Sequence, residues 1–337
     1  MTLEVKRQLI TQDASRRTFN LISREMEALE DELSRQMSSN IRVIDYLGDY
    51  LRSSGGKRVR PALLILSCYA AGGKAISDEV IRMAAVMEML HTATLVHDDI
   101  IDNADVRRGR PSVNARFGNH PAVLIGDWLY MSAFETALKE KSLEILEILT
   151  NLTRKMTEGE IIQLTTIGKL DISEEDYFDI LKRKTAYLFS GCCEIGAILA
   201  NTNHSRQKAL KEFGLNLGIA FQIADDLLDF VSSSDRLGKS AGADLAEGKV
   251  TLPILLLVKA DSTVKEKITE VMNNGSMDEK SAEKIAGLLK KHEIIEKVKA
   301  KAENFASLAR KSLEILPQSE YLDALGSLPD FVISRSY

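Results

Sequence analysis

The chain contains 337 residues, of which 45% are hydrophobic and 28% are charged, and its formal net charge is −5. This composition supplies a sizeable core and excludes a disordered chain, while the acidic balance argues against nucleic acid as the main partner. Six prolines and 20 glycines are too few for the many turns of an all-β chain.

The lengths of the hydrophobic runs and the spacing of the cysteines indicate the cellular compartment of the protein. No apolar run reaches the roughly 18 residues that a membrane span requires, and residues 1–10 carry charged side chains where a secretory signal would be apolar. Cys68, Cys192 and Cys193 form neither a disulfide framework nor a CxxC metal motif. We therefore expect buried thiols in a cytoplasmic protein.

Apolar residues recur at spacings of three and four along most of the chain, and this period predicts helices. In chain order, the expected helices before the Lys- and Glu-rich C-terminal part cover residues 19–33, 41–51, 61–71, 77–102, 121–139, 142–168, 174–201, 205–230 and 251–260. Residues 103–118 and 232–249 are polar and glycine-rich, which predicts loops, the first with a short helix. Long helices with short connections predict one all-α domain over residues 1–337.

Two acidic motifs of the form DDxxD follow apolar helix, one within His97–Asp102 and one within Gln222–Asp229. In a helix, Asp98 and Asp102 share one face and repel each other unless a cation lies between them. Hard oxygen ligands that leave open positions suit Mg²⁺, which takes substrate phosphates as further ligands. A single motif could be a solvated acidic helix end, but two copies favour a metal site.

Basic side chains accompany the acidic motifs. They are Lys57, Arg58 and Arg60 after Gly55–Gly56, Arg107 and Arg108 after the first motif, and Lys184, Lys239 and Lys249 around the second. Guanidinium groups bind phosphate oxygens in pairs, and lysines act as point charges. Two sets of carboxylates with several sets of cations predict two diphosphate sites, one bridged by metal and one held by basic side chains.

These motifs resemble the trans-isoprenyl diphosphate synthases of the polyprenyl synthetase family, over roughly residues 20–337. The matching segments are GGKRVRP (Gly55–Pro61), EMLHTATLVHDDIIDNADVRRGRPSVN (Glu88–Asn114), IGDWLY (Ile125–Tyr130), EGEIIQL (Glu158–Leu164), KTAYLF (Lys184–Phe189), GIAFQIADDLLDF (Gly218–Phe230) and GKSAGADLAEGKVTLP (Gly238–Pro253). The resemblance implies a helical bundle of the isoprenoid synthase type around a deep central cavity, and a homodimer.

The resemblance also implies roles for individual residues. About three Mg²⁺ ions would be held, with substrate, by Asp98, Asp102, Asp225 and Asp229. The allylic substrate and its diphosphate would be bound by Arg107, Lys184, Thr185, Gln222, Lys239 and Lys249. Isopentenyl diphosphate would be bound by Lys57, Arg60, His91 and Arg108. The residues expected to act in catalysis are Asp98, Asp102, Lys184, Thr185 and Asp225.

The implied reaction is repeated condensation of an allylic diphosphate, farnesyl or geranylgeranyl, with isopentenyl diphosphate, followed by product release with peripheral membrane contact. Alternatives are a short-chain farnesyl or geranylgeranyl diphosphate synthase and the catalytic subunit of a heteromeric hexaprenyl or heptaprenyl diphosphate synthase. The intact second motif and the GGKRVRP segment disfavour a terpene cyclase, and the two complete acidic motifs disfavour a non-catalytic regulatory subunit.

Product length depends on how far the cavity extends from Asp98. Helical spacing places Thr94 and Met87 below Asp98. In farnesyl-making relatives a bulky aromatic five residues before the motif closes the pocket, and this chain has Ala93 there. We therefore expect a long all-trans product of C30–C50, with octaprenyl (C40) preferred. The residues expected to set the chain length are Ala93, Met87, Met131 and Phe134.

Overall fold

The computed structural model describes residues 17–73, 77–231 and 242–334, so the predicted site residue Lys239 lies outside the described residues. The described elements are α2 (Ser23–Gln36), α3 (Arg42–Ser53), α4 (Val59–Ala70), α5 (Asp78–Ile101), β1 (Val106–Arg107), β2 (Arg110–Pro111), α6 (Val113–Phe117), α7 (Asn119–Leu138), α8 (Leu143–Thr166), α9 (Glu174–Leu181), the π-helical turn η1 (Lys182–Ala186), α10 (Tyr187–Leu199), α11 (His204–Val231), α13 (Ala243–Ala246), α14 (Leu252–Ala260), the 3₁₀ turn η2 (Ser262–Val264), α15 (Lys265–Asn274), α16 (Glu279–Lys291), α17 (Ile294–Ser312), the 3₁₀ turn η3 (Leu313–Ile315) and α18 (Glu320–Ser334). This confirms the all-α prediction.

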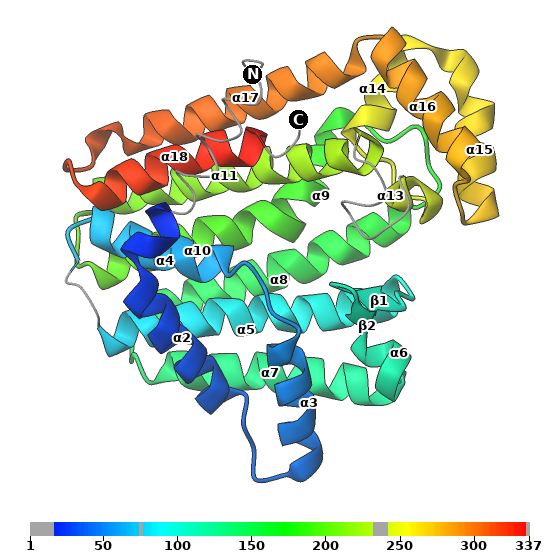
Figure 1. Cartoon of the computed structure of the whole chain (residues 1–337). Helices are drawn as coiled ribbons and strands as arrows, with labels where there is room; N and C mark the ends of the chain where they lie inside the picture. Colours follow the sequence, from blue (N-terminus) through cyan, green and yellow to red (C-terminus); the bar gives the residue numbers. More distant parts are fainter. Residues whose placement is uncertain (1–16, 74–76, 232–241, 335–337) are drawn as a thin grey trace.

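The long helices lie side by side in a stack (Figure 1). From one side to the other, α17 packs on α11, α11 on α10, α10 on α8 and α5, and α5 on α7. The helix α2 crosses the α5 side of this stack, and α14 to α16 form a smaller group at one end. The stack places the last turns of α5 and α11, which carry the acidic motifs, at one cavity.

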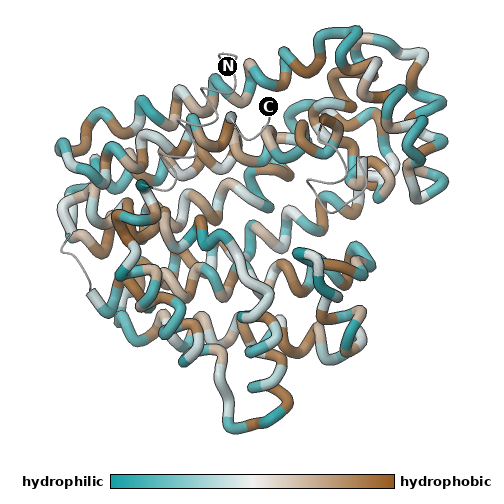
Figure 2. The backbone as a smooth tube through the Cα atoms, in the orientation of Figure 1, coloured by the Kyte–Doolittle hydropathy of each residue, from teal (hydrophilic) through white to brown (hydrophobic). Residues whose placement is uncertain are grey.

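Local sequence explains where these helices begin and how they are buried. The hydroxyl of Ser77 accepts a hydrogen bond from the backbone N–H of Val80 and caps α5, as expected for a serine at this position. The helix α5 is apolar around much of its circumference and is largely buried, whereas hydrophobic and hydrophilic residues alternate along outer helices such as α17 (Figure 2). The hydrophobic pattern of each helix therefore determines whether that helix lies at the centre or on the outside of the bundle.

The core has two large parts. One hydrophobic cluster joins α2, α4, α5, α7, α8, α10, α11 and α18, and a second joins α9 and α11 to α14–α17. Cys68, Cys192 and Cys193 are buried with free thiols, as expected. In the described residues, no helix is long and apolar enough to cross a membrane.

Two local features differ from the sequence expectations. The helix expected over 174–201 is interrupted by the π-helical turn η1, and the expected loop at 103–118 contains a short antiparallel ribbon in which Arg107 pairs with Arg110. Neither feature has a hydrophobic period of its own, so the pattern that predicts helices does not detect them. Both lie at the candidate site, and π-turns occur often at functional sites.

Candidate active site

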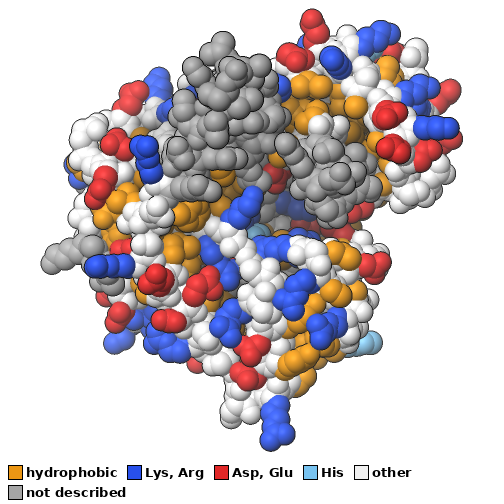
Figure 3. Space-filling view, in the orientation of Figure 1, with side chains coloured by type: hydrophobic (Ala, Val, Ile, Leu, Met, Phe, Trp, Pro, Cys, Tyr) orange, Lys and Arg blue, Asp and Glu red, His pale blue; other side chains and the backbone are white. Residues whose placement is uncertain are grey.

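One cavity of about 460 Å³ gathers most of the predicted site residues. Those that line it are Asp98, Asp225, Arg60, His91, Arg107, Arg108, Lys184, Thr185 and Gln222. Its apolar wall includes Tyr130, Met156 and Phe221. A second cavity of about 140 Å³ shares Lys184, Thr185 and Gln222 with it. Lys and Arg side chains gather near the centre of the face shown in Figure 3.

The first acidic motif lies in the last turn of α5. Burial, together with the nearby carboxylates of Glu160 and Asp102, raises the pKa of Asp98 to about 7, although Lys184 and Arg107 act in the opposite direction. Asp99 is buried and accepts a hydrogen bond from Arg107 Nε at 2.6 Å. The carboxylates of this group therefore repel one another, and a bound cation would relieve that repulsion.

The second acidic motif lies near the end of α11, and its aspartates face different ways. Asp225 lines the main cavity, whereas Asp226 is buried and lines the smaller one. The carboxylate of Asp229 accepts hydrogen bonds from the backbone N–H groups of Ala243 and Asp244 at 3.2 and 3.3 Å. The motif thus places one carboxylate opposite Asp98 and uses another to hold the segment that leads to Lys249.

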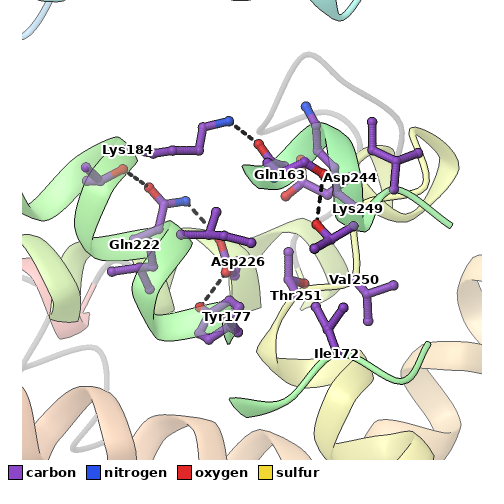
Figure 4. Close-up of a pocket in the computed structure, with 15 residues that line it drawn as sticks. Gln163, Ile172, Tyr177, Lys184, Gln222, Asp226, Asp244, Lys249, Val250 and Thr251 are labelled. Carbon is purple, nitrogen blue, oxygen red and sulfur yellow. Dashed lines mark hydrogen bonds between the residues drawn. The ribbon is translucent and has the colours of Figure 1, made fainter. Parts of the chain in front are cut away.

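The cations predicted to hold the allylic diphosphate are paired with carboxylates around the cavity. Lys249 Nζ lies 2.9 Å from Asp102 and 2.7 Å from Glu247. Lys184 Nζ lies 2.6 Å from Glu160 and also donates to the amide oxygen of Gln163 (Figure 4). These pairs keep the ammonium groups at the cavity edge.

A separate basic group lies at the start of α4. Arg60 Nη1 lies 2.9 Å from His91 Nε2, and the guanidinium lies over the ring of Phe189 at 5.1 Å from its centroid. Burial, followed by the charges of Arg60 and Arg108, lowers the pKa of His91 well below its usual value, so the ring is neutral and accepts from Arg60. Among the described residues, Arg60 Nε is buried and lacks a hydrogen-bond partner, so the guanidinium keeps an unused donor.

The loop that leads into α4 is held by two arginines. Arg58 adopts a left-handed conformation with φ of 47° and bridges Glu88 on α5 at 2.9 Å and Glu30 on α2 at 2.7 Å. Arg108, also left-handed, donates to the carbonyl oxygen of Gly55. Lys57 is exposed within this loop. The structure therefore ties the loop before Arg60 to α2, α5 and the turn after the first acidic motif.

The π-helical turn η1 carries two predicted site residues. Thr185 Oγ1 donates to Gln222 Oε1 at 2.8 Å, and Lys184 precedes it in the same turn. On the opposing helix α8, a side chain in place of Gly159 would lie 2.7 Å from Arg183 Cβ and 3.2 Å from Lys184 Cγ. The absence of a side chain at Gly159 lets α8 approach the turn closely.

The residues expected to set chain length fall in different places. Met131 is exposed over 63% of its surface on α7, so within one chain it does not form the cavity floor, and that expectation is wrong. The reason is that helical period places Met131 on the outer face of α7, whereas Phe134 is partly buried against the core. Met87 and Ala93 are fully buried on α5, and Thr94 lines the open cavity.

Two polar residues that line the cavities, Glu160 and Tyr177, were not predicted from the sequence. Glu160 lines the main cavity close to Asp98 and Lys184, and Tyr177 lines the smaller one. The signal for Glu160 was available in the segment EGEIIQL, where a second acid follows Glu158 at a spacing of two. No local motif marks Tyr177, because its contact with Asp226 depends on how α9 packs beside α11.

The donor set fits Mg²⁺. Asp98, Asp102 and Asp225 supply hard carboxylate oxygens, and the raised pKa of Asp98 shows that its negative charge is poorly compensated. In the described residues, no three acidic, His or Cys side chains converge as a complete ligand set.

The fold and the cavity define a class of protein: an all-helical protein with a site for phosphate esters and divalent cations. The model of the polyprenyl synthetase family matches residues 41–289, and the chain belongs to this family, whose members are trans-prenyltransferases. The resemblance inferred from the motifs is thereby confirmed.

Individual relatives cover nearly the whole chain. It is 36% identical over 314 residues to octaprenyl diphosphate synthase from Haemophilus influenzae, covering 93% of this chain and 94% of that protein. It is 34% identical over 323 residues to a short chain isoprenyl diphosphate synthase from Methanothermobacter thermautotrophicus, covering 94% and 98%. The crystal structure of a polyprenyl synthase from Caulobacter crescentus, complexed with calcium and isoprenyl diphosphate, matches with a TM-score of 0.90 and 34% identity, covering 96% and 98%.

Proposed function

We propose that this protein is a Mg²⁺-dependent prenyltransferase that adds isopentenyl units repeatedly to farnesyl or geranylgeranyl diphosphate and forms a long all-trans polyprenyl diphosphate. The observation that carries this proposal is the placement of Asp98 and Asp225 on one cavity with a separate basic group, Arg60 and His91, on the same cavity. One acidic and one basic region match the needs of two diphosphate substrates.

The allylic diphosphate is assigned to the acidic region. Lys184, Lys249 and Arg107 lie there and would exchange their carboxylate partners for phosphate oxygens. Mg²⁺ held by Asp98, Asp102 and Asp225 would supply further positive charge against the diphosphate. In the reaction, the allylic C–O bond breaks and its electron pair leaves with the diphosphate.

Isopentenyl diphosphate is assigned to the basic region. The unpaired Nε of Arg60 offers a buried donor, and the neutral ring of His91 holds the guanidinium in place. The π electrons of the bound alkene form the new C–C bond to the allylic carbon. The proton then lost can pass to the released diphosphate, so the chain needs no base of its own. The apolar wall with Tyr130, Met156 and Phe221 excludes water from the allylic cation.

For product length, we propose C30–C50, with octaprenyl as the main product. Ala93 leaves no bulky ring on α5, and the floor is assigned to residues deeper in the bundle, with Met87 and Phe134 as candidates. The relative named as an octaprenyl diphosphate synthase supports this length. Because a relative of similar identity is named as a short chain isoprenyl diphosphate synthase, the experiment must also distinguish a short product from a long one.

We also propose that two copies of this chain pair through α7. Leu124, Met131 and Leu138 are exposed and lie seven residues apart, so they form one apolar stripe along the helix. Val43 and Tyr46 on the neighbouring helix α3 are also exposed. A second copy would cover this surface, which is unusually apolar for an isolated chain.

The decisive experiment incubates the purified chain with farnesyl diphosphate, isopentenyl diphosphate and Mg²⁺, and analyses products by mass. We expect polyprenyl diphosphates centred on C40. Products of C20 or less would identify a short-chain synthase. Activity only after addition of a second, different chain would identify the catalytic subunit of a heteromer. The molar mass in solution should be that of two chains, and Leu124→Glu should reduce it to one.

A further inference from the structure

A chain of hydrogen bonds leads from a buried tyrosine to the cavity. Tyr177 on α9 donates to Asp226 Oδ2 at 2.6 Å, and Gln222 Nε2 donates to Asp226 Oδ1 at 2.8 Å (Figure 4). Thr185 Oγ1 then donates to Gln222 Oε1 at 2.8 Å. Tyr177 and Asp226 are buried, whereas Thr185 and Gln222 line the main cavity.

The direction of these hydrogen bonds is fixed at Asp226. With Tyr177 donating to Oδ2, Oδ1 of the carboxylate can only accept, so the Gln222 amide must present its NH₂ group there. The amide oxygen of Gln222 is then turned towards Thr185 and accepts its hydroxyl proton. Because Thr185 has only one O–H, its remaining lone pairs are available to the cavity.

Tyr177 holds the far end of this chain in place. Its hydroxyl supplies a donor for Asp226 Oδ2, and its ring belongs to the hydrophobic cluster that also holds Ile223 and Leu227 of α11. Asp226 lines the smaller cavity on this side of α11, whereas the adjacent Asp225 lines the main cavity. An acceptor as deeply buried as Asp226 Oδ2 is costly without a donor, so loss of the hydroxyl would free the carboxyl to rotate.

We propose that Tyr177 is a positioning residue for the prenyl transfer. Acting through Asp226 and Gln222, it orients the hydroxyl of Thr185 so that oxygen lone pairs, and not the proton, face the allylic carbon as positive charge develops there. Preoriented dipoles stabilise such charge because they need no reorganisation during the reaction. This inference rests on the proposed function, since it assigns the allylic carbon to the cavity beside Thr185.

The direct test is Tyr177→Phe, which removes the hydroxyl and keeps the ring. We expect kcat to fall by about tenfold or more, while KM for each substrate changes by less than about threefold. We also expect more of the consumed allylic diphosphate to appear as the free prenyl alcohol. The allylic cation would be less well stabilised and less well aligned with the alkene, so water would capture it more often. The readouts are steady-state kinetics and the alcohol-to-polyprenyl product ratio.

Tyr69→Phe is the matched control. Tyr69 is buried and donates to Glu25 at 3.0 Å, between α4 and α2, so the variant loses the same kind of hydrogen bond away from the cavity. It should lower the melting temperature to a similar degree and leave kcat and the product ratio unchanged. If both variants alter kcat equally, Tyr177 has only a structural role and the proposal is overturned.

A double-mutant cycle tests whether Tyr177 acts through Thr185. In a Thr185→Val background, Tyr177→Phe should cause no further loss of kcat, whereas independent roles would give multiplied losses and contradict the proposal. If Tyr177→Phe does not fold, Asp226→Asn is the second variant. An asparagine amide can either donate to or accept from Gln222, so the orientation of Gln222 is no longer fixed and kcat should fall. If the wild-type chain forms no C–C bond, the proposed function is refuted. If the wild type is active and the Tyr177 and Asp226 variants have the same kcat as the wild type, only this inference is refuted.

Discussion

Lys249 Nζ lies 2.9 Å from Asp102 Oδ1, and this contact joins the segment after the second acidic motif to the end of the first. Burial lowers the pKa of the Lys249 ammonium, but the carboxylates of Asp102 and Glu247 outweigh burial and the net pKa is raised. The side chain therefore stays charged at the edge of the cavity, where a diphosphate can replace its carboxylate partners.

Lys249→Ala should raise KM for the allylic diphosphate by about tenfold or more, because a charge-assisted hydrogen bond contributes about 1.5–3 kcal/mol. Arg60→Ala should instead raise KM for isopentenyl diphosphate, since Arg60 belongs to the separate basic region. Steady-state kinetics with each substrate varied in turn measures both effects. Equal effects of both variants on both substrates would contradict the assignment of two regions.

Asp98→Ala should lower kcat by at least about 100-fold, because it removes a carboxylate that would hold Mg²⁺. The melting temperature without metal should stay the same or rise, since Asp98 is buried near the carboxylates of Glu160 and Asp102. Asp31→Ala, at an exposed position on α2, is the control and should change neither value. Turnover near that of the wild type would show that Asp98 is not a metal ligand.

Arg58→Gln should raise KM for isopentenyl diphosphate several-fold with little effect on KM for the allylic substrate. Arg58 bridges Glu88 and Glu30 and thereby fixes the loop before Arg60, so its loss lets that loop move. Arg82→Gln is the matched control, because Arg82 forms a similar partly buried bridge to Glu140 at 2.7 Å.

The two arginine variants should lose comparable stability in thermal unfolding. Only Arg58→Gln should change substrate binding. An unchanged KM for isopentenyl diphosphate in Arg58→Gln would mean that the bridge stabilises the fold and does not position the loop.

Asp226→Asn should change how stability depends on pH. Burial, together with the nearby carboxylate of Asp244, raises the pKa of Asp226 to about 7, although the hydrogen bonds from Tyr177 and Gln222 act in the opposite direction. The folded chain then binds more protons here than the unfolded chain between about pH 4 and pH 7, so wild-type stability falls as pH rises through this window.

The asparagine variant has no such titration. Its melting temperature without metal should therefore exceed that of the wild type by a margin that grows from about pH 4 to pH 7 and is constant above. Thermal unfolding at several pH values measures this margin. A margin that does not change with pH would show that Asp226 is ionised in the folded protein throughout that range.

Thr94→Phe should shorten the product to about C15–C20, because Thr94 lines the open cavity on the face of α5 that carries Asp98. Ala93→Phe should also shorten it, but with a loss of stability, since Ala93 is fully buried and a ring there overpacks the core. Product mass and thermal unfolding distinguish the two. Unchanged products in both variants would refute the proposal that the chain grows along α5.

Much of the fold follows from the helical period. The spacing of apolar residues predicts α5 and α11, and the acidic motifs then fall on their last turns, as the structure shows. Helical spacing also predicts that His91 and Asp98, two turns apart, share a face, and both line the cavity. These predictions succeed because they depend on order within one helix.

Relations between helices could not be predicted in the same way. Asp225 and Asp226 point in different directions on α11, but helical spacing does not show that the first faces the main cavity and the second meets Tyr177 of α9. Met131 looked like a core residue because apolar residues surround it, but it lies on the outer face of α7. Pairing across helices depends on the packing of the whole bundle, which no local pattern records.

The π-helical turn Lys182–Ala186 also couples the movements of two predicted site residues. Lys184 and Thr185 are consecutive in this turn, and both line the cavity. Under the proposed function, one backbone segment therefore carries the ammonium group that would bind the diphosphate and the hydroxyl that would face the carbon it leaves. Any shift of that segment would move both groups together, so we expect the ammonium and the hydroxyl to keep the same spacing through the proposed rounds of elongation.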